Sequence, residues 1–159
     1  MKNIFNIKSF CLITLIVSIL SLITAIYIEH IIEIKPCKLC IYQRFPYLVA
    51  IFISFLGYYF PNNIFWVKLL TLIFVISFVI SGYHVGIENE FFKEFSGCTN
   101  KNINLLDKSE ILNSLQNEVI SCKNVNFKIL GMSLATINMI ISSLFVIIYL
   151  KIINNEKNK

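Results

Sequence analysis

Apolar residues fall in four long blocks along this chain of 159 residues, and short polar stretches separate the blocks. The blocks lie at about 10–28, 41–60, 69–87 and 129–150. Each is close to the roughly 20 residues that a helix needs to cross a hydrocarbon core of about 30 Å. The pattern predicts an all-α integral membrane protein, a four-helix transmembrane bundle, with residues 1–159 as a single domain.

The first block follows Lys2 and Lys8, as the apolar core of a secretory signal does. It is long for such a core, however, and no small-x-small cleavage site follows it before Glu29. We therefore expect this block to be retained as the first membrane helix.

Four crossings place both termini on one side of the membrane and the loops 29–40 and 88–128 on the other. Lysines are denser around the two termini than in these loops, which favours a cytoplasmic location for the termini. The protein is then multi-pass, with its two longer loops outside the cytoplasm.

The composition agrees with this reading and narrows the class of protein. Hydrophobic residues make up 57% of the chain and charged residues 14%, and the mean hydropathy is +0.74. A soluble domain of this size does not need so much apolar surface. The net charge of +5 comes from lysines that flank the blocks, so it points to orientation in the bilayer and not to nucleic acid.

The second extracytoplasmic loop contains a helix signal of its own. Asp107-Lys-Ser-Glu110 resembles a capping box, and apolar residues follow it at helical spacing. We expect a short amphipathic helix at about 107–121. It can lie on the membrane surface or pack on the end of the bundle.

The residues most suited to a functional site lie in and just after the first loop, in the stretch Pro36-Cys-Lys-Leu-Cys-Ile-Tyr-Gln-Arg44. A Cys-x-x-Cys pair can form half of a zinc site, close a structural disulfide, or cycle between dithiol and disulfide. A helix that begins near Cys40 would favour thiolate at that sulfur, and Arg44 lies one turn further along the same face. A thiolate beside a cation suits redox chemistry better than passive cross-linking.

Cys98 and Cys122 lie in the second loop, on the same side as Cys37 and Cys40, whereas Cys11 lies in the first helix. Paired cysteines that face an oxidising compartment form disulfides. A bond between Cys98 and Cys122 would close a loop and contribute on the order of 3 kcal/mol.

Two polar residues inside the predicted crossings lie at similar depth, namely Arg44 near the start of the second helix and His84 near the end of the third. Arg44 can reach out to lipid phosphate, and His84 can make an ordinary hydrogen bond between helices. Alternatively, both side chains meet the oxygens of a ligand with a polar head and an apolar tail beside Cys40. A membrane quinone fits that description.

Three stretches, taken together, resemble the DsbB family of bacterial disulfide bond formation proteins. The first-loop motif continues as Phe-Pro-Tyr47, Ser81-Gly-Tyr-His-Val-Gly-Ile-Glu88 resembles the family's third helix end, and Leu130-Gly-Met-Ser-Leu-Ala135 with Asn138 resembles the start of its fourth. Asn126 and Phe127 stand where many relatives have a Trp-rich stretch. This departure concerns the packing of the loop.

The resemblance implies an enzyme, a quinone-dependent oxidoreductase in the bacterial inner membrane. A Cys98–Cys122 disulfide would take electrons from a periplasmic DsbA-like oxidase, with Cys98 forming the mixed disulfide. Cys122 would then exchange with Cys37, and Cys40 would pass the electrons to ubiquinone or menaquinone near Arg44, with His84 as a second contact. The known potential of DsbA, about −120 mV, requires an acceptor beyond the glutathione range, and a quinone route is known to keep the periplasm oxidising.

Other classes of protein make different demands on the same residues. A metal-binding bundle usually brings two close pairs of ligands, and Cys98 and Cys122 are not such a pair, so we expect no metal. A structural protein would use its disulfides only to brace its loops. A vitamin-K-epoxide-reductase-like protein has a different motif order, and Gln43-Arg44 with Tyr83-His84 argues against it.

Overall fold

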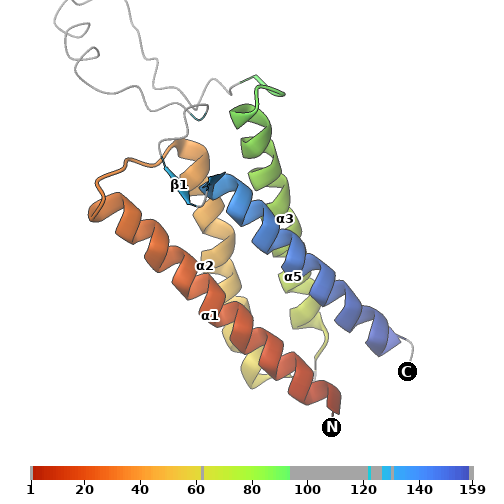
Figure 1. Ribbon diagram of the computed structural model, residues 1–159. Helices are drawn as coiled ribbons and strands as arrows, with labels where there is room; N and C mark the ends of the chain where they lie inside the picture. Colours follow the sequence, from red (N-terminus) through yellow and green to blue (C-terminus); the bar gives the residue numbers. More distant parts are fainter. Residues whose placement is uncertain (1, 62, 94–121, 123–126, 130, 158–159) are drawn as a thin grey trace, which may run out of the picture.

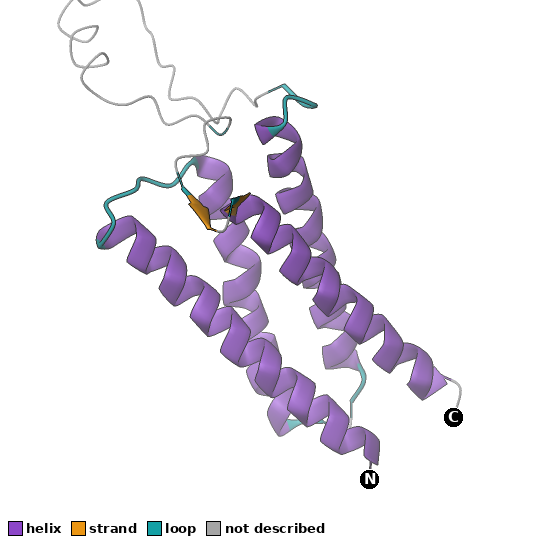
Figure 2. Cartoon of the chain, viewed as in Figure 1, coloured by secondary structure: helices purple, strands orange, loops and turns teal. Residues whose placement is uncertain are grey.

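The computed structural model describes residues 2–61, 63–93, 122, 127–129 and 131–157. These form the helices α1 (Lys2–His30), α2 (Lys38–Tyr59), α3 (Phe65–Glu88) and α5 (Leu134–Lys157), and the strands β1 (Lys128–Ile129) and β2 (Met132–Ser133) (Figures 1 and 2). All four helices are long and apolar enough to cross a membrane. The predicted all-α bundle is therefore confirmed for the described part of the chain.

The helices run up and down in chain order, with α1 packed on α2, α2 on α3, and α3 on α5. Figure 1 shows both termini at one end of the bundle, as four crossings require. The start of α2, the end of α3 and the start of α5 meet at the other end. Among the described helices, α1 and α5 are not one of the closely packed pairs.

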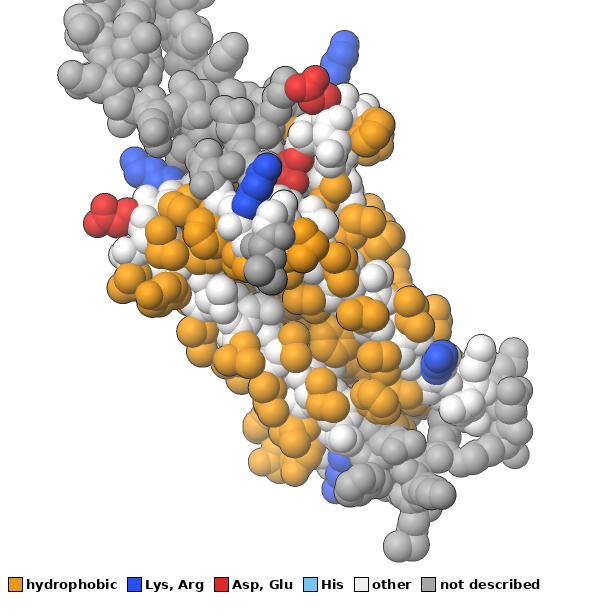
Figure 3. All heavy atoms as spheres, in the orientation of Figure 1, with side chains coloured by type: hydrophobic (Ala, Val, Ile, Leu, Met, Phe, Trp, Pro, Cys, Tyr) orange, Lys and Arg blue, Asp and Glu red, His pale blue; other side chains and the backbone are white. Residues whose placement is uncertain are grey.

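The outer surface of the bundle is apolar, and its charged side chains lie toward the ends (Figure 3). Phe52, for example, is 70% exposed and Leu20 is 56% exposed. Inside, aromatic rings fill the core: Phe74 stacks on Phe145 at 4.7 Å between ring centroids, and Tyr149 stacks on Phe145 at 6.0 Å. An apolar exterior of this kind is what a lipid environment requires.

The apolar blocks predicted the positions of the helices more accurately than the residues at which the helices begin and end. α1 covers more than the predicted 10–28, since residues near a membrane surface can be polar and still helical. α2 begins at Lys38 and not at 41, because Cys37 caps it. α3 begins at Phe65 and not at 69, where the Asn63 Oδ1 accepts a hydrogen bond from the Phe65 N–H at 2.9 Å.

The predicted start of the last helix, at 129, is wrong. Residues 128–129 and 132–133 form the antiparallel β1–β2 pair, in which Lys128 lies opposite Ser133. Gly131 makes the turn with φ at +81°, a conformation that glycine adopts without strain. Ser133 then caps α5, because its Oγ accepts a hydrogen bond from the Thr136 N–H at 3.1 Å. Gly131 and Ser133 thus serve a turn and a cap.

Two predictions lie outside the described residues. These are the amphipathic helix at 107–121 and the placement of Cys98.

Candidate functional site

Cys37 immediately precedes α2 and Cys40 lies in its first turn, and hydrogen bonds at the helix start connect them. Cys37 is the N-cap residue, and its Sγ accepts a hydrogen bond from the Cys40 N–H at 3.2 Å. The Cys37 thiol also donates to the Cys40 Sγ, at 2.9 Å between the sulfurs. The positive end of the helix dipole favours negative charge at this position.

The two sulfurs differ in how readily they lose a proton. The hydrogen bond to Cys40, and after it burial, raises the pKa of the Cys37 thiol from 9.0 to about 12. In the reduced pair, Cys37 therefore keeps its proton at neutral pH and directs it at Cys40. The Cys40 sulfur is the acceptor of this hydrogen bond.

His84 comes from α3 and lies beside Cys37. The residue is 3% exposed, and its Nε2 is 3.6 Å from the Cys37 Sγ and 3.7 Å from the Glu88 Oε1. The Gln43 Nε2 lies 3.0 Å from the His84 Nδ1 and donates to it, which leaves the ring proton on Nε2 in the neutral imidazole. The side chain thus joins the cysteine pair to an acidic group.

Arg44 forms an ion pair with Glu29, at the end of α1, with 2.5 Å between Nη1 and Oε2. Both side chains are partly exposed, at 24% and 31%. A cation at this depth is costly unless it is paired, and α1 supplies the partner. Arginine has five N–H donors, so this pair leaves others for a ligand.

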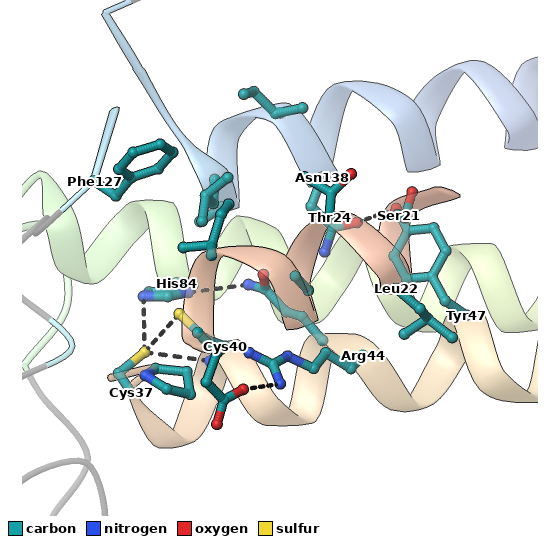
Figure 4. A pocket seen from close by; sticks show the side chains of 18 of the residues that line it. Ser21, Leu22, Thr24, Cys37, Cys40, Arg44, Tyr47, His84, Phe127 and Asn138 are labelled. Atoms are coloured by element: carbon teal, nitrogen blue, oxygen red, sulfur yellow. Dashed lines mark hydrogen bonds and ion pairs between the residues drawn. The ribbon is translucent and has the colours of Figure 1, made fainter. Parts of the chain in front are cut away.

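These side chains line one pocket, whose volume is about 380 Å³ (Figure 4). The residues of its lining that have polar, charged or thiol side chains include Glu29, Cys37, Cys40, Gln43, Arg44, His84 and Glu88. Apolar walls come from α1 and α5, among them Val17, Leu20, Ile137 and Ile141. Known ligand pockets have volumes of about 300–1,000 Å³, so this space is large enough for a small ligand.

Cys122 reaches the same end of the bundle. It is 2% exposed, packs in a buried cluster with Cys37, Leu39 and Ile87, and lines the pocket. The structure thus brings three of the four predicted catalytic cysteines together. The fourth, Cys98, lies outside the described residues, so its bond to Cys122 stays a prediction.

Cys37, Cys40 and His84 also form a set of metal donors, whose ligand atoms lie within 4.8 Å of one another. Two thiolates on a tetrahedral zinc ion would be about 3.8 Å apart, given Zn–S bonds of about 2.3 Å. Here the sulfurs are 2.9 Å apart and share a hydrogen bond. The geometry is closer to a dithiol than to a zinc site.

Several residues of the site were missed in the sequence. Glu29, Gln43 and Glu88 each pair with a predicted site residue, and Asn138 lines the pocket from α5. Glu29 could have been predicted as a partner of Arg44. Because α1 and α2 are antiparallel, the end of α1, which holds Glu29, lies at the same depth as the start of α2, which holds Arg44.

Comparisons with known proteins indicate the family of this chain. The family model described as disulfide bond formation protein DsbB matches residues 7–152. An uncharacterized protein of Rickettsia prowazekii (strain Madrid E) is 29% identical over 147 residues, which is 89% of this chain and 83% of that protein.

Two proteins called disulfide bond formation protein B match over shorter segments. The one from Blochmanniella pennsylvanica (strain BPEN) is 51% identical over 49 residues, 28% of each chain. The one from Psychromonas ingrahamii (strain DSM 17664 / CCUG 51855 / 37) is 33% identical over 43 residues, 27% of this chain and 23% of that protein. With the family match over nearly the whole chain and four helices able to cross a membrane, this chain belongs to the DsbB family of disulfide bond formation proteins.

Proposed function

We propose that this chain is a quinone-dependent thiol oxidase that re-oxidises a periplasmic DsbA-like protein and so supports disulfide bond formation in secreted proteins. The observation that carries the proposal is the Cys37–Cys40 pair in the lining of a pocket that has both polar and apolar walls. A structural disulfide needs no such pocket beside it.

The residues of the pocket fit a quinone. Arg44 offers N–H donors to a ring oxygen, and α1 and α5 offer apolar walls to a tail. A buried amide nitrogen of Asn138 has no hydrogen-bond partner among the described residues, so a donor is still available there. When bound, a quinone would take up the two electrons and two protons that the Cys37–Cys40 dithiol gives up as its disulfide forms.

Electrons reach this pair by thiol–disulfide exchange. A partner thiolate attacks Cys98 and frees Cys122, and the second partner thiol then resolves the mixed disulfide and leaves Cys98 reduced. Cys122 attacks Cys37 and frees Cys40, and Cys98 finally attacks Cys122, which restores the Cys98–Cys122 disulfide and leaves Cys37 as a thiol. Each step forms one S–S bond and breaks one. The burial of Cys122 in one cluster with Cys37 supports the central exchange.

Cys40 is suited to leave in that exchange. Its sulfur lies in the first turn of α2, where the positive end of the helix dipole favours negative charge. A thiol that is more stable as thiolate leaves faster. Arg44 and His84 line the same pocket, so we assign them to the oxygens of the quinone and to the support of the cysteine pair.

The partner and the location follow from the same scheme. The site is at the end of the bundle opposite the two termini (Figure 1). With the termini in the cytoplasm, this end faces the periplasm, where a DsbA-like protein can reach it. The chain would then lie in the bacterial inner membrane and draw on the respiratory quinone pool.

Thiol trapping in isolated membranes tests the proposal. A Cys11→Ala background removes the cysteine of the core, and a reduced DsbA-like protein is supplied with or without a short-chain ubiquinone or menaquinone. We expect Cys37 and Cys40 to accumulate as alkylated thiols without quinone and to be protected with it. Cysteines that stay oxidised under both conditions would indicate a purely structural role. Metal analysis of the purified, reduced protein tests the zinc alternative.

A further inference from the structure

The oxygen and the nitrogen of the Asn138 side-chain amide have different surroundings in the bundle. Its Oδ1 lies close to three hydroxyl groups, those of Tyr47 at 2.5 Å, Ser142 at 3.3 Å and Ser77 at 3.5 Å. Three hydroxyls that converge on one atom favour the oxygen of the amide there. They therefore fix which way the side chain faces.

The other end, Nδ2, has no hydrogen-bond partner among the described residues, although Asn138 is only 8% exposed. Buried polar groups are nearly always paired, so an unpaired donor needs an explanation. Asn138 lines the pocket, and Figure 4 shows its nitrogen turned away from Tyr47 and toward the pocket space. The unpaired donor therefore faces the place where a ligand would lie.

Arg44 and Asn138 face this pocket from different helices and at different depths. Tyr47, which holds the amide, lies three residues after Arg44, about 4.5 Å further along α2. The guanidinium and the amide nitrogen both offer only N–H donors. Such a pair suits a ring with acceptor oxygens at opposite ends.

We propose that the Asn138 amide donates a hydrogen bond to the second ring carbonyl of a 1,4-quinone whose first carbonyl lies at Arg44. The inference rests on the proposed function and adds a residue of α5 that sets the orientation of the ring. The bond is available to the reduced ring as well, because a hydroxyl oxygen also accepts.

A purely structural role leaves the nitrogen unexplained. The contact among α2, α3 and α5 uses the Oδ1 of Asn138 and the hydroxyls of Tyr47, Ser77 and Ser142. The Ser142 and Ser77 hydroxyls are 2.9 Å apart and hydrogen-bond to each other, so part of this network persists without the amide. Nδ2 takes no part in these contacts.

Binding to the oxidised full-length chain in lipid nanodiscs tests the inference without any turnover. The two probes are 2,3-dimethyl-1,4-naphthoquinone and 2,3-dimethyl-1-tetralone, a similar fused ring with one carbonyl, and calorimetric titration gives each Kd. The variant is Asn138→Leu, of similar shape. The matched control is Ser77→Ala, which removes one hydroxyl from the same network without lining the pocket.

We expect wild type to bind the naphthoquinone about three- to tenfold more tightly than the tetralone, the range for one neutral hydrogen bond. Asn138→Leu should lose about that factor for the naphthoquinone and little for the tetralone, while Ser77→Ala should change neither Kd by more than about twofold.

Equal losses for both probes in Asn138→Leu would mean that the variant disturbs packing, and would overturn the inference. Equal Kd values for the two probes in wild type would overturn it even if Asn138→Leu does not fold. Tight naphthoquinone binding that is indifferent to Asn138 leaves the proposed function intact, whereas no naphthoquinone binding by wild type contradicts both.

Discussion

At the scale of single residues, the raised pKa of Cys37 gives a pH profile that can be measured. A thiol with a pKa of 9.0 reaches its full alkylation rate soon above that pH, because only the thiolate reacts. With a pKa of about 12, Cys37 stays mostly protonated, so its rate should be low at pH 8 and rise about tenfold per pH unit up to pH 10.

Mass spectrometry of reduced, iodoacetamide-treated membranes gives the rate at Cys37 against pH. A peptide covering residues 36–44 supplies the profile without the fold. A plateau at Cys37 below pH 10 would contradict the hydrogen-bonded, buried thiol described above.

Replacement of either sulfur of the pair tests its assignment as the electron donor to quinone. We expect Cys37→Ala and Cys40→Ala to abolish quinone-linked oxidation of a partner dithiol, because neither variant can form the disulfide. Both should still insert in the membrane, which fractionation checks. Cys11→Ala, at a buried cysteine of the core, is the control and should keep full turnover. Full turnover in either pair variant would rule the assignment out.

Arg44 is expected to hold a quinone oxygen while Glu29 holds the guanidinium. A charge-assisted hydrogen bond contributes about 1.5–3 kcal/mol, so Arg44→Ala should raise the half-saturating quinone concentration about ten- to a hundredfold. Arg44→Lys keeps the charge but loses the planar fork of donors, and its effect should be smaller.

Steady-state oxidation of the partner across quinone concentrations measures this effect. Glu29→Gln separates the effect of the Glu29–Arg44 ion pair from the effect of the contact between Arg44 and the quinone, because it removes the anion and leaves the arginine in place. An unchanged half-saturation in Arg44→Ala would place the quinone elsewhere.

The sequence predicted that the cysteine pair and Arg44 lie together, and they line one pocket, because a motif within about two turns of helix specifies their relative positions. Glu29, Gln43 and Asn138 were not predicted as site residues. Their roles depend on pairs across different helices, and no local spacing encodes how two helices are rotated against each other. A pattern of hydropathy shows which residues are apolar, but not which polar residue faces which.

At the scale of elements, Ser133 determines where α5 begins. Its Oγ accepts from the Thr136 N–H and donates to the Glu88 Oε2 at 2.6 Å, so it joins the cap of α5 to the end of α3. Ser133→Ala should lower stability by about 1 kcal/mol, the usual cost of a lost cap. Thermal unfolding in detergent measures this, with Ser143→Ala as the control. Equal unfolding temperatures for the two variants would show that the cap contributes nothing.

Hydropathy located all four helices and misjudged the start of the last one for a physical reason. Residues 129–133 are mostly apolar, so they extend the apolar block, although the chain there turns at Gly131. Turn geometry depends on backbone conformation, which an average over apolar residues does not detect. A glycine followed two residues later by a serine was the local signal for a turn and a cap.

At the scale of the whole molecule, the order of exchange predicts a trapped complex with the partner. In Cys122→Ala, the Cys98 thiolate should attack the disulfide of an oxidised DsbA-like protein, which forms a mixed disulfide and frees the partner's second thiol. Because Cys122 is absent, Cys98 cannot be withdrawn into its own disulfide, so the adduct should accumulate. A non-reducing gel from cells that make the partner shows this adduct, and the Cys98→Ala, Cys122→Ala double variant is the control. Absence of the adduct in Cys122→Ala would contradict Cys98 as the residue that meets the partner.

The position of α1 and α5 determines the units in which the affinity of the pocket for an apolar ligand should be given. These two helices wall the pocket and are not one of the closely packed pairs among the described helices, so an apolar ligand would enter between them from the lipid. The quantity that governs its binding is then the mole fraction of ligand in the bilayer. Adding lipid that contains no protein dilutes the ligand within the bilayer. At fixed amounts of protein and ligand, it should therefore lower the fraction of pockets that hold ligand. Binding constants from membranes of different lipid content would agree only per mole of lipid.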